Sequence, residues 1–542
     1  AVVVSLDLSA NGLTGAIPPA IAGLSHLTDL DLSENALTGE IPAALGTLSA
    51  LRWLDLGVNQ LSGPIPPVLG DLGNLQFLIA NDNQLSGPLP PELGNLTSLV
   101  ALSLYNNELS GVIPAALGGM SALTNVDLAR NALSGPIPSE LGNLVYLDTL
   151  NLGGNALSGP IPDALGDLSR LRFLFLFDNQ LEGPIPDALG QIAGLSSLSL
   201  GGNHLEGPIP EALSALSDLW LLSLAGNRLS GPVPEYLGSL ERMYWLDLEY
   251  NALSGPLPTS LANLTDLFWL RLGYNMLWTD DPALEAFLAE KDPYWDTTQT
   301  RSPTDIEAAP TGRGARVTWT PRQDLAGDGY YEVGVATSPG GPYAPAAPTA
   351  SLWERQVTVR GLEPGQTYYV AVRTYRPGWG QQQNDLLTGY SDEVSVVPAP
   401  YDIPVSEYEA LVAFHEATGG PEWTAPWALP AEDPCSLYGV TCSAGHVTRL
   451  RLRANGLRGA LPEALAALPG LIELDLSGNS LSGVVPAALG DLPRLAILRL
   501  GANALCGPLP AALGGLERLG DLDLQRNMLW TDDAALQAFL DL

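Results

Sequence analysis

The residues best suited to chemistry in this sequence are carboxylates that recur at intervals of 24 residues. Asp7, Asp31 and Asp55 follow this spacing, and Asp29 lies two residues before Asp31. If these carboxylates belong to neighbouring strands of one sheet, they lie about 5 Å apart. Such a stack can bind a basic peptide or a divalent cation such as calcium, although no cofactor is otherwise expected. The alternative is that the carboxylates are solvated and bind nothing.

Aromatic side chains follow the same spacing and form a second candidate site. Trp53 precedes Phe77 by 24 residues, and Phe173, Phe175 and Phe177 alternate along one segment. Rings exposed on a rigid sheet are suited to contact a protein, peptide or glycan ligand. The alternative is lateral packing between neighbouring rings, which also stabilises a sheet. The candidate ligand-binding residues are Trp53, Phe77, Phe173, Phe175, Phe177, Trp245, Tyr250, Trp269 and Tyr274.

The sequence contains no arrangement of residues that is typical of an enzyme. Its histidines have no metal-ligand spacing and do not accompany a nucleophile motif; they are His26, His204, His415 and His446. We therefore predict a protein without catalytic residues and without a firm metal site.

A 24-residue repeat positions the carboxylates and the rings. Leu150 and Leu152 alternate with polar residues, which predicts a strand with its leucines in the core and its polar side chains in solvent. An asparagine ends each strand, and its amide can bond backbone groups of its own turn and of the neighbouring coil. Stacked coils therefore predict an asparagine ladder at Asn11, Asn35, Asn59, Asn83, Asn107, Asn131, Asn155, Asn179, Asn203, Asn227, Asn251, Asn275, Asn455, Asn479, Asn503 and Asn527.

The rest of each repeat closes the coil. Residues 159–162 read Gly-Pro-Ile-Pro, which predicts an extended segment because proline lacks a donor and restricts its predecessor. A short helical turn is expected over residues 163–168. A repeat of this length indicates a solenoid in which each coil contributes one strand.

The pattern L-x-x-L-x-L-x-x-N-x-L-S-G-P-I-P of residues 147–162 resembles the plant-type leucine-rich repeats of receptor kinase ectodomains and polygalacturonase-inhibiting proteins. The resemblance implies an α/β solenoid of two arrays, with parallel strands on the concave face and short helical or 3-10 turns. We expect a first array of twelve repeats at residues 1–275 and a C-terminal cap at 276–300. Because the terminator Asn-Met-Leu-Trp-Thr-Asp-Asp returns near the end of the chain, we expect a second cap at 528–542.

Residues 301–399 have short apolar runs between glycine and proline turns, a pattern typical of strands. Residues 361–372 are similar to the fibronectin type III domain, which has a Leu-x-Pro turn before a strand tyrosine. That resemblance implies an all-β sandwich with Trp319, Leu362, Tyr368 and Val370 at core positions. It also implies that the Tyr368 hydroxyl bonds back to the turn.

Residues 400–446 resemble the N-terminal cap of plant-type repeats, in which a C-x-W-x-G-V-x-C segment forms one disulfide. The resemblance implies a Cys435–Cys442 disulfide, although Leu437 stands where the family has tryptophan. A disulfide indicates an oxidising, extracytoplasmic site. The second array of four repeats is expected at residues 447–527. Residue 1 aligns with Gly445 or His446, so we expect a cap upstream of the first coil, or else a partner or end-to-end stacking that covers it.

The composition of the chain bears on its class of partner, on membrane insertion and on its source. A formal net charge of −35 makes nucleic acid an improbable partner. No apolar run approaches the roughly 20 residues that span a bilayer. Lys291 is the single lysine, and this bias, together with the abundance of alanine, glycine and arginine, favours a bacterial source.

Two functions are consistent with these features. The first is a non-catalytic, extracellular or cell-surface protein for binding or adhesion, which recognises its ligand through concave repeat faces. The alternative is a structural subunit of a surface fibre or layer that self-associates end to end. The solenoid geometry, the exposed aromatic residues and the absence of catalytic motifs favour the first function, whereas the duplicated module, the acidic surface and the uncapped first coil motivate the alternative.

Overall fold

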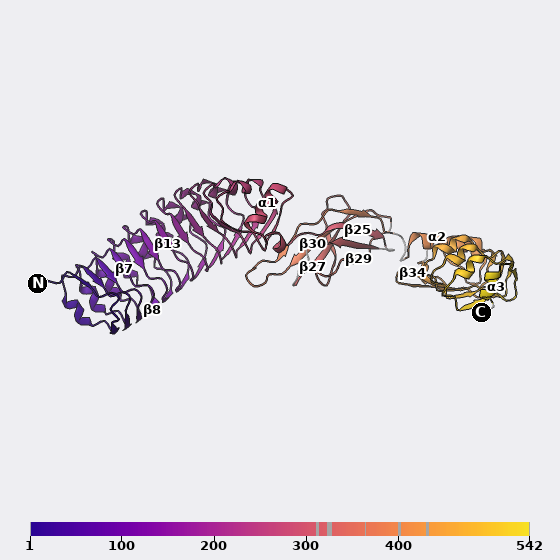
Figure 1. Ribbon diagram of the computed structural model, residues 1–542, viewed down its shortest axis with the longest axis horizontal. Helices are drawn as coiled ribbons and strands as arrows, with labels where there is room; N and C mark the ends of the chain where they lie inside the picture. The colour runs from indigo at the N-terminus through magenta and orange to yellow at the C-terminus, as the bar shows by residue number, and fades with distance from the viewer. Residues whose placement is uncertain are drawn as a thin grey trace. The chain divides into compact units, whose positions relative to one another are not determined.

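The computed structural model describes residues 2–310, 314–321, 328–363, 365–398, 403–429 and 433–540. The chain forms two compact units. The first comprises Ala1–Arg301 and Tyr375–Thr388, and the second comprises Ser302–Thr374 and Gly389–Leu542. Figure 1 shows the repeats of the first unit in indigo to magenta.

A parallel sheet runs through the first unit, with one strand from each coil (Figure 1). Leu30 lies beside Leu54, and Leu54 beside Leu78, so the register repeats every 24 residues. These leucines are at most 2% exposed, because the pleat turns every second side chain into the core. In order, the strands are β1 (Ser5–Asp7), β3 (Asp29–Asp31), β5 (Trp53–Asp55), β7 (Phe77–Ile79), β9 (Ala101–Ser103), β11 (Asn125–Asp127), β13 (Thr149–Asn151), β15 (Phe173–Phe175), β17 (Ser197–Ser199), β19 (Leu221–Ser223), β21 (Trp245–Asp247) and β23 (Trp269–Arg271).

A second parallel sheet forms where each chain segment leaves the asparagine turn. Leu61 and Leu85 from this sheet are fully buried against the first one. Its strands are β2 (Thr14–Gly15), β4 (Ala36–Gly39), β6 (Gln60–Gly63), β8 (Gln84–Pro88), β10 (Glu108–Gly111), β12 (Ala132–Gly135), β14 (Ala156–Gly159), β16 (Gln180–Gly183), β18 (His204–Gly207), β20 (Arg228–Gly231), β22 (Ala252–Pro256) and β24 (Met276–Trp278).

A short 3-10 helix closes each coil after the second proline, which has extended backbone angles. Neighbouring helices pack so closely that a Cβ at Gly70 would lie 2.2 Å from the Glu92 carbonyl oxygen. The Leu-Gly step of the repeat therefore keeps the coils in contact. The helices are η1 (Pro19–Gly23), η2 (Ala43–Thr47), η3 (Pro67–Asp71), η4 (Pro91–Asn95), η5 (Ala115–Gly119), η6 (Ser139–Asn143), η7 (Asp163–Asp167), η8 (Asp187–Gln191), η9 (Glu211–Ala215), η10 (Glu235–Ser239) and η11 (Thr259–Asn263).

The asparagines hydrogen-bond between coils. The Asn203 amide nitrogen donates to the carbonyl of Leu200 in its own turn (3.0 Å) and to that of Leu176 in the preceding coil (3.0 Å). Its amide oxygen accepts from the backbone nitrogen of Leu181 (3.0 Å). Asn203 is fully buried, so each bond satisfies a backbone group that no water reaches.

Helix α1 (Pro282–Lys291) covers the last coil of the first array. The Asp281 carboxylate accepts from the backbone nitrogens of Ala283 and Leu284 and thereby caps the helix. Gln299, 24 residues after Asn275, then completes the ladder. Its amide donates to the Leu272 carbonyl and accepts from the Leu277 nitrogen, both at 2.9 Å. A short helix, η12 (Asp296–Thr298), precedes it.

The next part of the chain forms a β-sandwich with Val317, Val333 and Val370 in its core. The Glu363 backbone nitrogen donates to the Tyr368 hydroxyl (3.1 Å), which is the turn contact expected of a tyrosine corner. One antiparallel sheet contains β25 (Thr304–Pro310), β26 (Gly314–Thr320) and β29 (Gln356–Arg360). The other contains β28 (Ala344–Pro348), β27 (Tyr330–Ala336), β30 (Tyr368–Arg376), β31 (Leu386–Leu387) and β32 (Val394–Val396).

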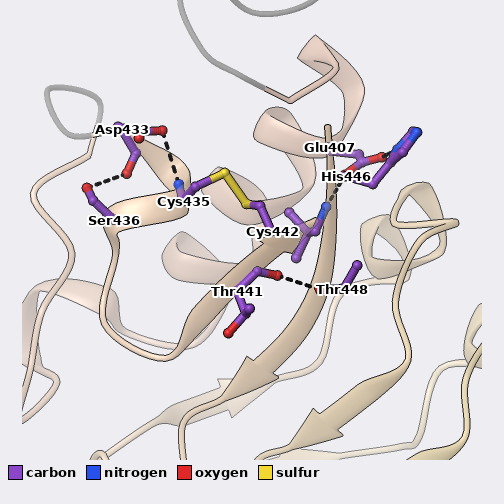
Figure 2. Close-up of a disulfide and its surroundings, with 9 residues drawn as sticks. Glu407, Asp433, Cys435, Ser436, Thr441, Cys442, His446 and Thr448 are labelled. Atoms are coloured by element: carbon purple, nitrogen blue, oxygen red, sulfur yellow. Dashed lines mark hydrogen bonds and ion pairs between the residues drawn. A yellow bond between two sulfur atoms is a disulfide. The ribbon is translucent and has the colours of Figure 1, made fainter. Parts of the chain in front are cut away.

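The C-terminal module begins with helix α2 (Val405–Ala417), which packs against η15 (Glu463–Ala467) and hydrogen-bonds to the first strand of the second array. The Glu407 carboxylate accepts from the Val447 nitrogen (2.8 Å) and lies 2.5 Å from His446 Nδ1 (Figure 2). Cys435 and Cys442 form a disulfide beside it, as Figure 2 shows. The remaining elements are η13 (Gly420–Glu422), η14 (Pro434–Ser436), β33 (Val440–Ser443), β34 (His446–Arg451), β35 (Arg458–Ala460), η15 (Glu463–Ala467), β36 (Glu473–Asp475), β37 (Ser480–Gly483), η16 (Ala487–Asp491), β38 (Ile497–Arg499), β39 (Ala504–Pro508), η17 (Ala511–Gly515), β40 (Asp521–Asp523), β41 (Met528–Trp530) and α3 (Ala534–Leu540).

No helix in the described ranges combines the length and the apolar character needed to cross a membrane.

Candidate functional site

The odd-numbered strands from β1 to β23 form one sheet, and the solvent side of this sheet is here called the sheet face. The sheet face carries the predicted aromatic residues in separate groups. Trp53 and Phe77 are in contact, with ring centroids 4.5 Å apart. The ring centroids of Phe173 and Phe175, which lie on one strand, are 6.3 Å apart. The Phe177 ring covers Gly153 so closely that a Cβ there would lie 2.5 Å from it. The predicted rings therefore do not form one continuous surface.

The last two coils bring the other predicted rings together. Trp245 and Trp269 stack at 4.5 Å with an angle of 12° between their planes. Tyr250 and Tyr274 stack at 4.3 Å and 8°. In each pair one face of each ring is covered by its partner.

A further set of rings at this end was missed in the sequence. Trp220, Tyr244 and Phe268 lie one residue before their strands and are 39%, 44% and 65% exposed. Tyr244 and Phe268 stack at 5.2 Å. Their 24-residue spacing was the available signal. The Trp245–Trp269 pair of the same coils is half-buried, and these five rings are here called the aromatic band; large exposed rings such as Phe268 are of the kind that marks protein interaction sites.

Carboxylates lie beside the aromatic band. Burial raises the pKa of Asp247 to about 6, and burial together with the Asp247 charge raises the pKa of Glu249 to about 7. Burial also raises the pKa of Asp292. Arg271 lies over the Trp269 ring at 4.6 Å, and its Nη1 is 3.9 Å from Glu249 Oε1. One guanidinium therefore faces several carboxylates, and the local charge is negative.

Two adjoining grooves run along this part of the sheet face. One, of about 520 Å³, lies between Trp245, Trp269, Arg271 and the cap residue Tyr294. The other, of about 490 Å³, extends across earlier coils as far as Phe177. Both are lined by Asp247, Glu249, Tyr250 and Gln381. Gln381 comes from residues 375–388. These residues belong to the first unit, although residues 302–374 separate them in the sequence from the rest of that unit.

The predicted acidic stack near the N-terminus has local hydrogen-bond partners. Asp7 Oδ1 accepts from the Ser9 nitrogen (3.0 Å), Asp31 Oδ1 from the Ser33 nitrogen (2.9 Å), and Asp55 Oδ1 from the Gly57 nitrogen (2.9 Å). Asp29 accepts from the Thr28 hydroxyl (2.6 Å). Within the described ranges, no group of three or more histidine, cysteine, aspartate or glutamate side chains could hold a metal ion. Asp7, Asp31 and Asp55 thereby stabilise the turns that follow their strands.

The corresponding face of the second array is occupied by ion pairs. Arg451 donates to both carboxylate oxygens of Glu473, at 2.8 and 2.7 Å. Arg499 Nη2 lies 2.5 Å from Asp521, and its Nη1 lies 3.7 Å from Asp475. These charges satisfy one another, so the best candidate site is in the first array.

The fold defines the class of protein. The chain combines leucine-rich repeat arrays with a fibronectin type III domain. The leucine rich repeat model matches residues 2–61 and 445–505, and a second one matches 74–96, 98–120, 122–144, 146–168, 170–192 and 194–216. The fibronectin type III domain model matches residues 301–388.

Particular relatives come from plants. The chain is 36% identical over 88 residues to polygalacturonase inhibitor 1 of Oryza sativa subsp. japonica, covering 15% of this chain and 26% of the relative. It is similar to the plant peptide hormone receptor RGFR1 in complex with RGF2, at 27% identity and a TM-score of 0.52, over 97% of this chain and 63% of that one. It is also similar to the PEPR1–AtPEP1 complex, at 25% identity and a TM-score of 0.51, over 97% of this chain and 65% of that one. The chain thus spans less than two thirds of each relative's length.

Proposed function

We propose that this protein is a non-catalytic, extracellular or cell-surface binding protein that recognises a polypeptide ligand through the sheet face of its first array. The aromatic band and the adjoining grooves carry this proposal. Trp245, Trp269 and Arg271 line one groove together with Asp247 and Glu249, and tryptophan and arginine side chains are among those that dominate the energetics of protein interfaces. The likeness to RGFR1 in complex with RGF2 supports it.

The proposed organisation gives each part a role. The array at residues 1–275, with its cap at 276–300, binds the ligand. The fibronectin type III domain at 301–399 connects it to a second module. That module comprises a disulfide-bonded cap at 400–446, an array at 447–527 and a final cap at 528–542. Adhesion is the use that we propose for a ligand on another cell or on the surrounding matrix.

The test is selection of a ligand by the full chain from a phage-displayed library of random linear peptides. A selected peptide, resynthesised and labelled, should bind the wild-type protein saturably. Trp269→Ala and Trp245→Ala, which remove rings that line one groove, should each weaken binding by about tenfold, the loss expected for one well-packed aromatic contact. Tyr146→Ala is the matched control, because this residue is 48% exposed and lies away from the grooves. Equal affinities for all variants would contradict the proposed site.

A further inference from the structure

Residues 375–388, here called the strap, fold as a preorganised hairpin. The backbone nitrogen of Gly378 and the hydroxyl of Tyr375 both donate to the Asp385 carboxylate, at 2.9 Å. The backbone nitrogen of Gln382 donates to the Trp379 carbonyl (2.9 Å). The strap therefore keeps its shape through its own hydrogen bonds before any contact with the array is counted.

Side-chain amides anchor the strap to the last coils. Gln382 donates to the carbonyls of Asn251 (3.0 Å) and Tyr274 (2.7 Å) and is 1% exposed. Asn384 donates to the carbonyl of Asn227 (2.7 Å), and its amide also donates to the Gln382 amide oxygen (2.8 Å). These bonds join the strap to the backbone of consecutive ladder turns.

The anchored strap places two further amides at the grooves. Gln381 lines both grooves, and Gln383, whose amide nitrogen also donates to the Gly226 carbonyl (3.4 Å), lines the one that extends to Phe177. The floor of the grooves comes from the array, so the strap supplies a wall on the side of the ladder turns. Primary amides offer both donors and acceptors, which is what the backbone of an extended chain requires.

The dimensions indicate the occupant. From the coil of Phe177 to that of Trp269 there are four coil spacings, or about 19 Å at the strand separation of a sheet. An extended peptide of about six residues covers this length. The strap itself is a polypeptide that binds the ladder turns with amide side chains, so this edge is already complementary to such a chain.

We propose that the strap forms one wall of the ligand groove and that Gln381 and Gln383 determine which extended peptide binds. This inference rests on the proposed binding function of the sheet face. It makes the site composite, because residues that the sequence assigns to the fibronectin type III domain complete a groove of the repeat array.

The experiment uses the full chain and the labelled peptide selected by the wild-type protein. The double variant Gln381→Ala and Gln383→Ala is expected to bind it about tenfold more weakly, since two amide contacts are lost. Leu387→Ala is the control, because Leu387 is 41% exposed on the same strap and lines neither groove. A second double variant, Gln382→Ala and Asn384→Ala, removes the anchors. It should weaken binding similarly and speed hydrogen exchange over residues 375–388.

Each other outcome decides against the inference. An unchanged Kd in both double variants would show that the ligand does not contact the strap, while the proposed function would stand. Tighter binding after removal of the anchors would make the strap a competitor of the ligand instead of a wall. Failure of the wild-type protein to select any peptide would refute the proposed function together with the inference.

Discussion

Replacing Asp247 with asparagine is expected to stabilise the first array at neutral pH and to leave its stability unchanged in acid. Asp247 has a pKa of about 6 in the folded protein because burial disfavours its charge. In the unfolded chain its pKa returns to about 3.8. Well below pH 3.8 both states are protonated, so burial of the group has no electrostatic cost. Between pH 4 and pH 6 the unfolded state loses its proton first, and the free energy of unfolding falls.

The size of the effect follows from the same values. A pKa raised from 3.8 to about 6 corresponds to about 3 kcal/mol for a group that no water reaches. Because Asp247 is only partly buried, we expect about 1–2 kcal/mol after solvent screening. The change keeps the local hydrogen bond, since an asparagine oxygen can also accept from the Glu249 nitrogen, which lies 3.2 Å from Asp247 Oδ1.

Differential scanning calorimetry at pH 7.5 and pH 3.5 measures the difference in stability between the Asp247→Asn variant and the wild-type protein. At pH 7.5 the transition of the first unit should rise by about 2–4 °C in the Asp247→Asn variant, and at pH 3.5 it should match that of the wild-type protein. Asp266→Asn is the control, because Asp266 is an exposed carboxylate on the last coil of the array. A variant that is less stable at pH 7.5, or one whose difference from wild type does not depend on pH, would refute the reasoning.

Three further predictions concern stability. Asn203→Ala leaves several buried backbone groups without partners, so urea unfolding should show a loss of about 3 kcal/mol or more; a loss below about 1 kcal/mol would argue against the ladder. Gly70→Ala should destabilise by about 2 kcal/mol, whereas Gly73→Ala, where an added Cβ meets nothing within 4 Å, should be neutral; equal effects would contradict the close packing of the coils. Replacing Cys435 and Cys442 with serine should destabilise the C-terminal module by about 2–3 kcal/mol in the chain-entropy estimate, and unchanged thermal unfolding would show that the surrounding cap makes the disulfide redundant.

Most of the repeat architecture could be predicted from the sequence, because the contacts of a solenoid lie at fixed separations along the chain. Leu54 must lie beside Leu78 if both occupy the same position in consecutive coils, and the same argument pairs Trp245 with Trp269. Side-chain direction follows from the pleat, which alternates core and solvent along each strand. The stacking of Trp245 on Trp269 was therefore accessible from spacing alone.

Some features carried a signal that was not used. Gln299 lies 24 residues after Asn275 and performs the same hydrogen bonding with a side chain one methylene longer. Trp220, Tyr244 and Phe268 share the repeat spacing with the predicted rings and are exposed at the same end of the array. In the early acidic stack, the structure adds that Oδ1 of Asp7, Asp31 and Asp55 accepts from the backbone nitrogen two residues further on, a turn contact that the regular spacing did not indicate.

The sequence by itself determined the coil, the register and the ladder, since each depends on residues at most a few tens of positions apart. Only the tertiary structure placed Gln382 on the Asn251 carbonyl, across a separation of 131 residues with no periodic relation between them. It also decided that Asp247 and Glu249 are buried enough for their pKa values to rise, while Asp7, in the same position of the first coil, has its pKa lowered by hydrogen bonds from Ser9. Burial is a property of the surroundings, and the repeat pattern is the same in both places.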